Sequence, residues 1–188
     1  MSESAMTVAP EPTARLGGRE LHRIVYTEER IRERVAAMGR EITRAYDGED
    51  DLLVLGLLKG SFIFLADLVR RIERPLHVDF VVASSYGGRR MSGGDVRLLY
   101  DPEASLAERA VVVVDDIVDS GATLNRLLPL LQERRPQSLE LCALLHKRRA
   151  RLWREPRWVG FEAPAEFLVG YGLDHAEDLR HLPYIASV

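Results

Sequence analysis

The 188-residue chain alternates continuous apolar runs with apolar positions spaced as on a helix. The clearest run is AVVVV at 110–114, five small or β-branched residues without alternation. Such a run is typical of a strand covered on both faces, as in a parallel sheet. Further strands are predicted at 52–58, 76–84, 96–100 and 138–145, and apolar segments follow at 158–161 and 167–169.

Three helices are predicted between these runs. Thr27 is placed to cap the first, whose opening turn carries Glu28 and Glu29 on the side of the helix dipole that favours acids. The second follows residue 61, and the third spans 123–135 and is stopped by Pro136. The side chains expected to face the core are Ile31, Val35, Met38, Ile42 and Ala45, then Phe62, Leu65, Leu68 and Val69, then Leu124, Leu127, Leu128 and Leu131.

Two segments lack such patterns. Residues 1–18 are rich in Pro, Ala, Ser, Thr and Gly, so we expect a disordered tail there and a single domain over 19–188. Residues 85–95 carry four glycines and two arginines with little apolar content, which predicts a mobile hairpin flap. A disordered surface loop is the alternative for this segment.

Composition narrows the function. An apolar content of 46% with 29% charged residues is ordinary for a soluble globular protein, and the net charge of −3 does not favour nucleic-acid binding. The one cysteine, Cys142, lies in an apolar run, which predicts a core thiol and a cytoplasmic protein. No apolar stretch reaches the roughly 20 residues of a membrane helix. The arginine-rich run 148–157 is interpreted as a solvated face or subunit contact.

The residues after the central run suggest anion chemistry. Asp119, Ser120, Gly121, Ala122 and Thr123 supply backbone N–H groups and two hydroxyls where a helix begins, which favours a phosphate. The neighbouring carboxylates would repel that phosphate unless Mg²⁺ or a ribose diol lay between them. The spacing fits neither a Walker loop nor a Gly-x-Gly-x-x-Gly motif. The alternative is a strand end whose acids only cap the helix.

A second anion site is expected at 58–61, where Lys59 and Gly60 stand between a strand and a helix. A plain turn with Lys59 in solvent is the alternative.

The block VVVVDDIVDSGAT at 111–123 resembles the phosphoribosyl diphosphate (PRPP) signature of type I phosphoribosyltransferases. Within that family the chain is most similar to the hypoxanthine-guanine enzymes of purine salvage, from about residue 25 to the C-terminus. The supporting blocks are LLKGSF at 57–62, VDFVVASSYG at 78–87, LHKR at 145–148 and EFLVGYGLDHAEDLRHLPYI at 166–185. The resemblance implies the type I fold: an α/β domain with a mostly parallel sheet flanked by helices, a small C-terminal hood and a flexible flap loop.

The implied reaction is Mg²⁺-dependent transfer of the phosphoribosyl group from PRPP to N9 of hypoxanthine or guanine, which gives IMP or GMP and pyrophosphate. The resemblance assigns PRPP binding to Lys59, Gly60, Asp115, Asp116, Asp119, Ser120, Gly121, Ala122, Thr123 and Arg180. It assigns Mg²⁺ to Asp115, Asp116 and Asp174, and places an unusual non-proline cis peptide before Lys59 in the pyrophosphate loop. It also implies a dimer or tetramer.

The resemblance makes Asp119 the general base that takes or shares the purine N7 proton. Its neighbours Asp115 and Asp116 are expected to raise its pKa toward a useful value. Lys147 is implied to contact the purine O6, Phe167 to stack on the ring and Leu168 to meet its edge. Ser85 and Tyr86 are implied to lie near the base of the flap.

Several alternatives stay open. On spacing alone, Phe167 fits a core aromatic and Asp174 a turn acid. Asp115 stands where many relatives have Glu, and His146 where they have an acid before Lys147. The protein could also be a regulatory relative that binds PRPP and reads RNA or DNA, or an enzyme of the same fold that acts on xanthine, adenine or a pyrimidine.

Overall fold

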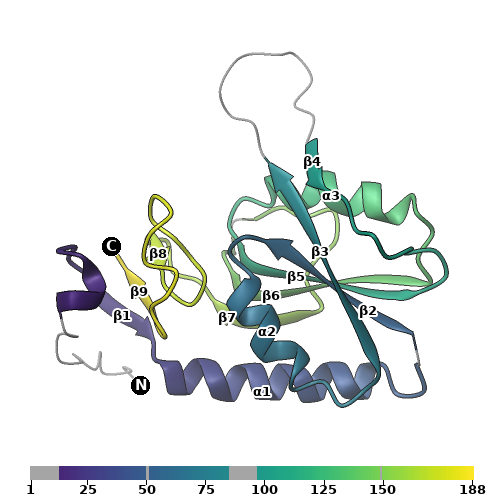
Figure 1. The fold of residues 1–188 in the computed structure, drawn as a ribbon, viewed down its shortest axis with the longest axis horizontal. Coiled ribbons are helices and arrows are strands. Elements are labelled where there is room, and N and C mark those ends of the chain that lie inside the picture. Colours follow the sequence, from purple (N-terminus) through teal and green to yellow (C-terminus); the bar gives the residue numbers. More distant parts are fainter. Residues whose placement is uncertain (1–12, 50, 85–96, 149) are drawn as a thin grey trace.

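A computed structural model of the chain describes residues 13–49, 51–84, 97–148 and 150–188. Among these residues a six-stranded sheet has the order β4-β3-β2-β5-β6-β7 (Figure 1). Only β4 runs antiparallel to its neighbour. The strands are β2 Leu52–Leu58, β3 Leu76–Ser84, β4 Arg97–Tyr100, β5 Ala110–Val118, β6 Ser138–His146 and β7 Trp158–Glu162. The predicted mostly parallel α/β sheet is confirmed.

Helices cover both faces of this sheet. Helices α1 (Glu28–Ala45) and α2 (Phe62–Val69) pack on one face, and α3 (Ala122–Gln132) packs on the other (Figure 1). Successive β5 side chains divide between two apolar clusters, with Val112 on the α1 side and Val113 on the α3 side, both fully buried. Burial of each such side chain contributes about 1.5–3 kcal/mol, so the run at 110–114 anchors the strand from both sides.

The capping and the periodicity of α1 agree with the sequence. The Thr27 side chain accepts a hydrogen bond from the Arg30 N–H, and the predicted apolar stripe from Ile31 to Ile42 is buried. Two predictions about the other helices are wrong. In α2 the ring of Phe62 is 45% exposed and Phe64 is buried instead, because Phe64 shares a helix face with Leu65 and Leu68. Helix α3 ends at Gln132 and not at Arg135, whose φ is +56°.

A separate small sheet forms the hood. It joins β1 (Arg23–Tyr26), β9 (Ile185–Ser187) and β8 (Leu168–Val169) in that order, all antiparallel, beside the end of α1 where that helix begins (Figure 1). The hood is therefore not purely C-terminal as predicted, since β1 supplies an edge strand. Only pairing with the distant β9 reveals this, because β1 is too short to stand alone.

The tail also departs from the prediction in part. Thr13–Leu16 forms a short 3₁₀ helix, although the composition predicts disorder through residue 18. Leu16 packs against the apolar cluster of the hood, and the Arg15 carbonyl lies 3.1 Å from Nε2 of His181. These contacts order the end of the tail; residues 1–12 lie outside the described part.

Two further features concern the chain as a whole. Cys142 is buried in β6, as predicted, and burial raises the pKa of its thiol. Within the described ranges, no helix has the length and apolar content that crossing a membrane requires.

Candidate active site

The carboxyl ends of β2 and β5 and the start of α3 line an open cavity of about 240 Å³. Parallel strands in an α/β sheet present such a crevice at this edge. The cavity collects most of the predicted PRPP residues. Its lining includes Gly60, Asp115, Asp116, Asp119, Ser120, Gly121, Ala122 and Thr123.

The loop between β5 and α3 has the conformation of an anion cradle. Gly121 caps α3 with φ +79°, in the left-handed region that suits glycine. A Cβ there would lie 2.6 Å from Cδ2 of Leu152 and 3.1 Å from the Arg151 carbonyl oxygen. Oγ of Ser120 accepts a hydrogen bond from the Ala122 N–H at 3.3 Å. The loop thus brings a hydroxyl and the amino end of a helix to the cavity.

Two adjacent carboxylates form the wall beside this cradle. Asp115 is 7% exposed, and its Oδ1 accepts the Asp116 N–H at 3.0 Å; Oδ1 of Asp116 accepts the Ile117 N–H at 2.9 Å. Burial raises the pKa of Asp115 well above its usual range, and the charge of Asp116 adds to the rise. Burial raises the pKa of Asp116 as well, while its hydrogen bonds with Asp115 and with the backbone, and to a smaller extent the positive charge of Arg180, oppose the rise. Hydroxyl groups or a cation would stabilise these acids as anions.

The loop after β2 packs directly on Asp116. A Cβ on Gly60 would lie 1.7 Å from Oδ2 of Asp116, so any side chain there would require the Asp116 carboxylate or the loop to shift. The peptide bond between Leu58 and Lys59 is cis, as the resemblance implied. Ser61 anchors the loop, because its buried hydroxyl donates to the Leu57 carbonyl at 2.7 Å.

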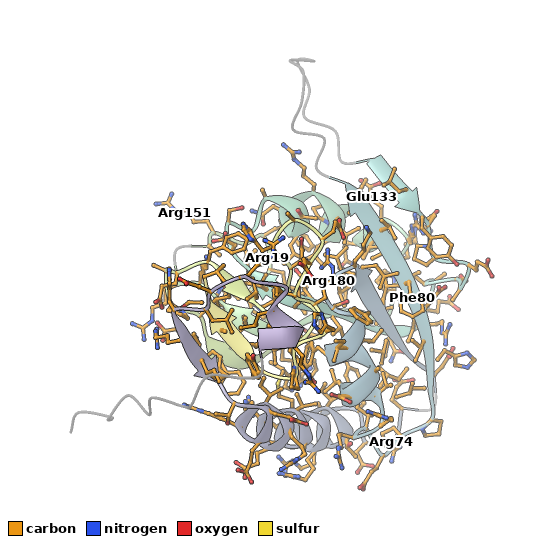
Figure 2. All side chains as sticks on the ribbon, turned by 60° about the vertical axis from the view of Figure 1, so that its left-hand side comes forward. Arg19, Arg74, Phe80, Glu133, Arg151 and Arg180 are labelled. Atoms are coloured by element: carbon orange, nitrogen blue, oxygen red, sulfur yellow. The ribbon has the colours of Figure 1, made fainter. Side chains whose placement is uncertain are left out.

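The hood reaches the same place through the segment from Gly170 to Arg180. Gly172 has φ +103°, and a Cβ on it would lie 2.1 Å from the Gly60 carbonyl oxygen. Arg180 donates to the Gly172 carbonyl at 2.8 Å and pairs with Asp174 at 2.8 Å. In the view of Figure 2 Arg180 is drawn near the centre of the molecule and Arg151 near its left-hand edge.

Sequence reasoning missed Glu177. One of its oxygens accepts from Lys59 Nζ at 3.2 Å and the other from Arg180 Nη2 at 3.0 Å. The hydrogen bond from Arg180, and after it that from Lys59, lowers the pKa of Glu177. The sequence contained a signal for Glu177, because this residue lies three positions before Arg180 within the block 166–185 that resembles the family. Asp174 also behaves as a turn acid, because its Oδ2 accepts the Glu177 N–H at 2.9 Å.

The structure joins two predicted residues that are 28 positions apart. Nζ of Lys147 lies 3.4 Å from Oδ1 of Asp119, and the two side chains are 10% and 48% exposed. The Lys147 N–H donates to the Val118 carbonyl at 2.9 Å, which holds the end of β6 beside the end of β5. The base position and the position assigned to O6 recognition therefore form one ion pair.

Phe167 and Leu168 lie on the hood. The ring of Phe167 is 55% exposed and meets the His175 ring edge-on at 5.5 Å, so its interpretation as a core aromatic is wrong. Leu168 is buried and pairs with Ser187 across β8 and β9.

The remaining predicted features lie outside the described residues or outside the lining of the cavity. Ser85 and Tyr86, with the rest of the flap, lie outside the described residues. Among the described residues, no cluster of three or more His, Cys, Asp or Glu side chains has the arrangement of a metal site, so Asp174 does not complete a cluster with Asp115 and Asp116. Nε2 of His146 lies 4.0 Å from Glu155 and is buried without a hydrogen bond.

The basic run has intramolecular partners. Arg154 and Arg157 pair with Glu140 at 3.7 and 3.6 Å, and Arg148 pairs with Glu162. Arg157 also lies over the Trp158 ring at 4.8 Å. These contacts favour the solvated-face interpretation over a nucleic-acid patch.

Comparisons with known proteins agree with this geometry. A family model described as the phosphoribosyl transferase domain matches residues 24–176. The chain is 41% identical over 169 residues to a hypoxanthine-guanine phosphoribosyltransferase of Dictyostelium discoideum, which covers 88% of this chain and 94% of the relative. It is 43% identical over 167 residues to the hypoxanthine phosphoribosyltransferase of Escherichia coli strain K12, with the same coverage of 88% and 94%. A crystal structure of a Bacillus anthracis hypoxanthine-guanine phosphoribosyltransferase superposes with a TM-score of 0.84 at 42% identity, covering 90% of this chain and 99% of that one.

Proposed function

The chain belongs to the phosphoribosyltransferase family, and from this premise we propose that it is a purine salvage enzyme that acts on hypoxanthine or guanine. In the reaction the bond between the anomeric carbon of PRPP and pyrophosphate breaks, and a bond from that carbon to N9 of the purine forms. The products are IMP or GMP and pyrophosphate. The observation that carries the proposal is the cavity lined by a helix-start anion loop, the buried Asp115 and the half-buried Asp116. Asp119 of the same lining is paired with Lys147.

We assign each part of PRPP to the residues around the cavity whose chemical groups suit it. The loop from Asp119 to Thr123 holds the 5′-phosphate through backbone N–H groups and hydroxyls at the amino end of α3. The ribose hydroxyls donate to Asp115 and Asp116, which relieves the cost of burying these carboxylates. Lys59, the Gly60 backbone and Arg180 receive the pyrophosphate, because both cations lie where the second loop meets the hood.

Mg²⁺ is the proposed cofactor. Asp115, Asp116 and Asp174 form no closed ligand cluster among the described residues. They would therefore hold Mg²⁺ mainly through water and substrate oxygens, the hard ligands that this ion prefers. When bound, the ion neutralises charge on the departing pyrophosphate.

The purine is placed by the hood and by the end of β6. The exposed Phe167 ring offers a stacking surface, and Leu168 offers backbone groups to the purine edge. Lys147 donates to O6, which favours 6-oxopurines over adenine. Asp119 accepts or shares the N7 proton as N9 attacks, and Lys147 beside it holds the carboxylate toward the base.

We propose that Ser85 and Tyr86 stand at the base of a flap that excludes water during transfer. The net charge of −3 and the ion pairs of the basic run disfavour the regulatory alternative that reads nucleic acid. A cytoplasmic location suits a chain whose only thiol is buried.

Self-association as a dimer or tetramer is also proposed. Several apolar side chains of α2, β3 and β4 are exposed, and a second copy would cover them. They are Phe62, Val78, Phe80, Leu99 and Tyr100. Sedimentation equilibrium tests this assignment, and a monomer at micromolar concentration would reject it.

The function is tested by turnover with PRPP and Mg²⁺, offering hypoxanthine, guanine, xanthine and adenine separately while pyrophosphate release is followed. We expect release with hypoxanthine or guanine and none with adenine. Release with adenine or xanthine alone would assign a different base. No pyrophosphate release with any of the four bases, together with PRPP binding, would favour the regulatory alternative.

A further inference from the structure

Glu177 has no role in the proposed reaction, yet it contacts both cations that receive the leaving group. Its Oε1 lies 3.2 Å from Lys59 Nζ, and its Oε2 lies 3.0 Å from Arg180 Nη2. Lys59 and Glu177 are 118 positions apart, so the fold brings them together. One carboxylate thus spans two cations, with one oxygen on each, as two oxygens of a phosphoryl group would.

The loop is built to hold Glu177 in this position. Ala176, Glu177 and Leu179 have φ values of +54°, +66° and +68°, in the left-handed region that residues other than glycine rarely adopt. The Glu177 N–H donates to Oδ2 of Asp174 at 2.9 Å, which fixes the turn. Three residues of this loop therefore keep an unfavourable backbone conformation, and that conformation presents the Glu177 carboxylate to the two cations.

The two cations differ in how firmly they are held. Arg180 is 19% exposed and is also bound by Asp174 and by the Gly172 carbonyl, so it stays in place without Glu177. Lys59 and Glu177 are 68% and 66% exposed, and pairs this open to solvent are weak. Glu177 is therefore the exchangeable partner, which an anion of higher charge can replace.

We propose that Glu177 is a resident anion of the pyrophosphate subsite: it occupies Lys59 and Arg180 between turnovers and competes with pyrophosphate for them. The proposal rests on the proposed function, which assigns these cations to pyrophosphate. Glu177 acts through Lys59 and Arg180 and forms no bond with the reacting atoms, so it is a positioning residue. Competition weakens the hold on the product, and the return of the carboxylate to the cations aids its departure.

The experiment compares wild type with Glu177→Gln, which keeps the shape and removes the charge. Asp178→Asn is the matched control, because it removes a neighbouring charge whose partners are Arg19 and the Leu179 N–H. Calorimetry measures the dissociation constant of magnesium pyrophosphate, and steady-state assays measure KM for PRPP and hypoxanthine. In Glu177→Gln we expect about two- to tenfold tighter pyrophosphate binding and a lower KM for PRPP, as exposed pairs allow. The KM for hypoxanthine stays unchanged, and Asp178→Asn matches wild type.

The outcomes separate the inference from the function beneath it. Unchanged or weaker pyrophosphate binding in a Glu177→Gln variant that still turns over would overturn the resident-anion role and leave the function standing. Equal tightening in Asp178→Asn would also overturn it, because the effect would then belong to loop charge. A wild type that neither binds pyrophosphate nor turns over any base refutes both. If Glu177→Gln does not fold, Glu177→Asp replaces it in the experiment. Its side chain is too short to span both cations, so it should show the same change in pyrophosphate binding.

Discussion

Replacing Asp115 with Asn should stabilise the metal-free protein at neutral pH while weakening its function. The carboxylate is 7% exposed, and its charged form is penalised first by burial and then by the charge of Asp116. Asn keeps an oxygen that can accept the Asp116 N–H, so the substitution removes the charge and retains the hydrogen bond at 3.0 Å. The expected gain is about 1–3 kcal/mol.

The pH dependence follows from the direction of the shift. The folded protein keeps the Asp115 proton to higher pH than the unfolded chain, whose carboxyl has a pKa of about 4. Between these two values the folded state binds more protons, so the Asp115 contribution to stability falls as pH rises. The cost of the buried Asp115 charge to stability is complete above the pKa of the folded state and absent below the pKa of the unfolded state. The advantage of Asp115→Asn should therefore shrink on acidification.

Calorimetric melting in the presence of a chelator measures this effect at about pH 8 and pH 4.5. For a chain of this length, about 1–3 kcal/mol corresponds to a Tm rise of about 2–12 °C at the higher pH. Asp47→Asn, at a side chain that is 84% exposed, is the control and should leave Tm nearly unchanged. PRPP binding should weaken about 10- to 100-fold in Asp115→Asn through the lost hydrogen bonds to a charged acceptor. A lower Tm at pH 8, or an equal rise at both pH values, would refute the reasoning.

Three further substitutions test the site. Asp119→Asn should lower kcat by about two to four orders of magnitude with PRPP still bound, and unchanged turnover would exclude the base role. Lys147→Ala should raise the KM for hypoxanthine far more than that for PRPP, whereas equal effects would argue against O6 recognition. Gly60→Ala places a methyl group 1.7 Å from Oδ2 of Asp116, so the KM for PRPP should rise at least tenfold in steady-state assays; a wild-type value would show that the loop adapts.

Local patterns determined much of the fold and of the central motif. The run at 110–114 specifies a strand buried on both faces, and the apolar stripe after Thr27 specifies α1, because each depends on the periodicity of its own segment. The polar residues that follow β5 could be assigned to one edge of the sheet, since the carboxyl ends of parallel strands meet there. The acids, the glycine and the hydroxyls of the cavity were thus available from sequence.

Tertiary structure alone decided which side chains meet. The pairs of Lys147 with Asp119 and of Lys59 with Glu177 depend on where separate loops end in space, and no local period encodes such distances. The place of β1 in the hood likewise depends on its pairing with β9 at the other end of the chain. The residue types in the sequence determine which chemistry is possible at this edge of the sheet. Packing between distant segments determines which charged side chains form ion pairs, because such pairs need their atoms within a few ångströms of each other.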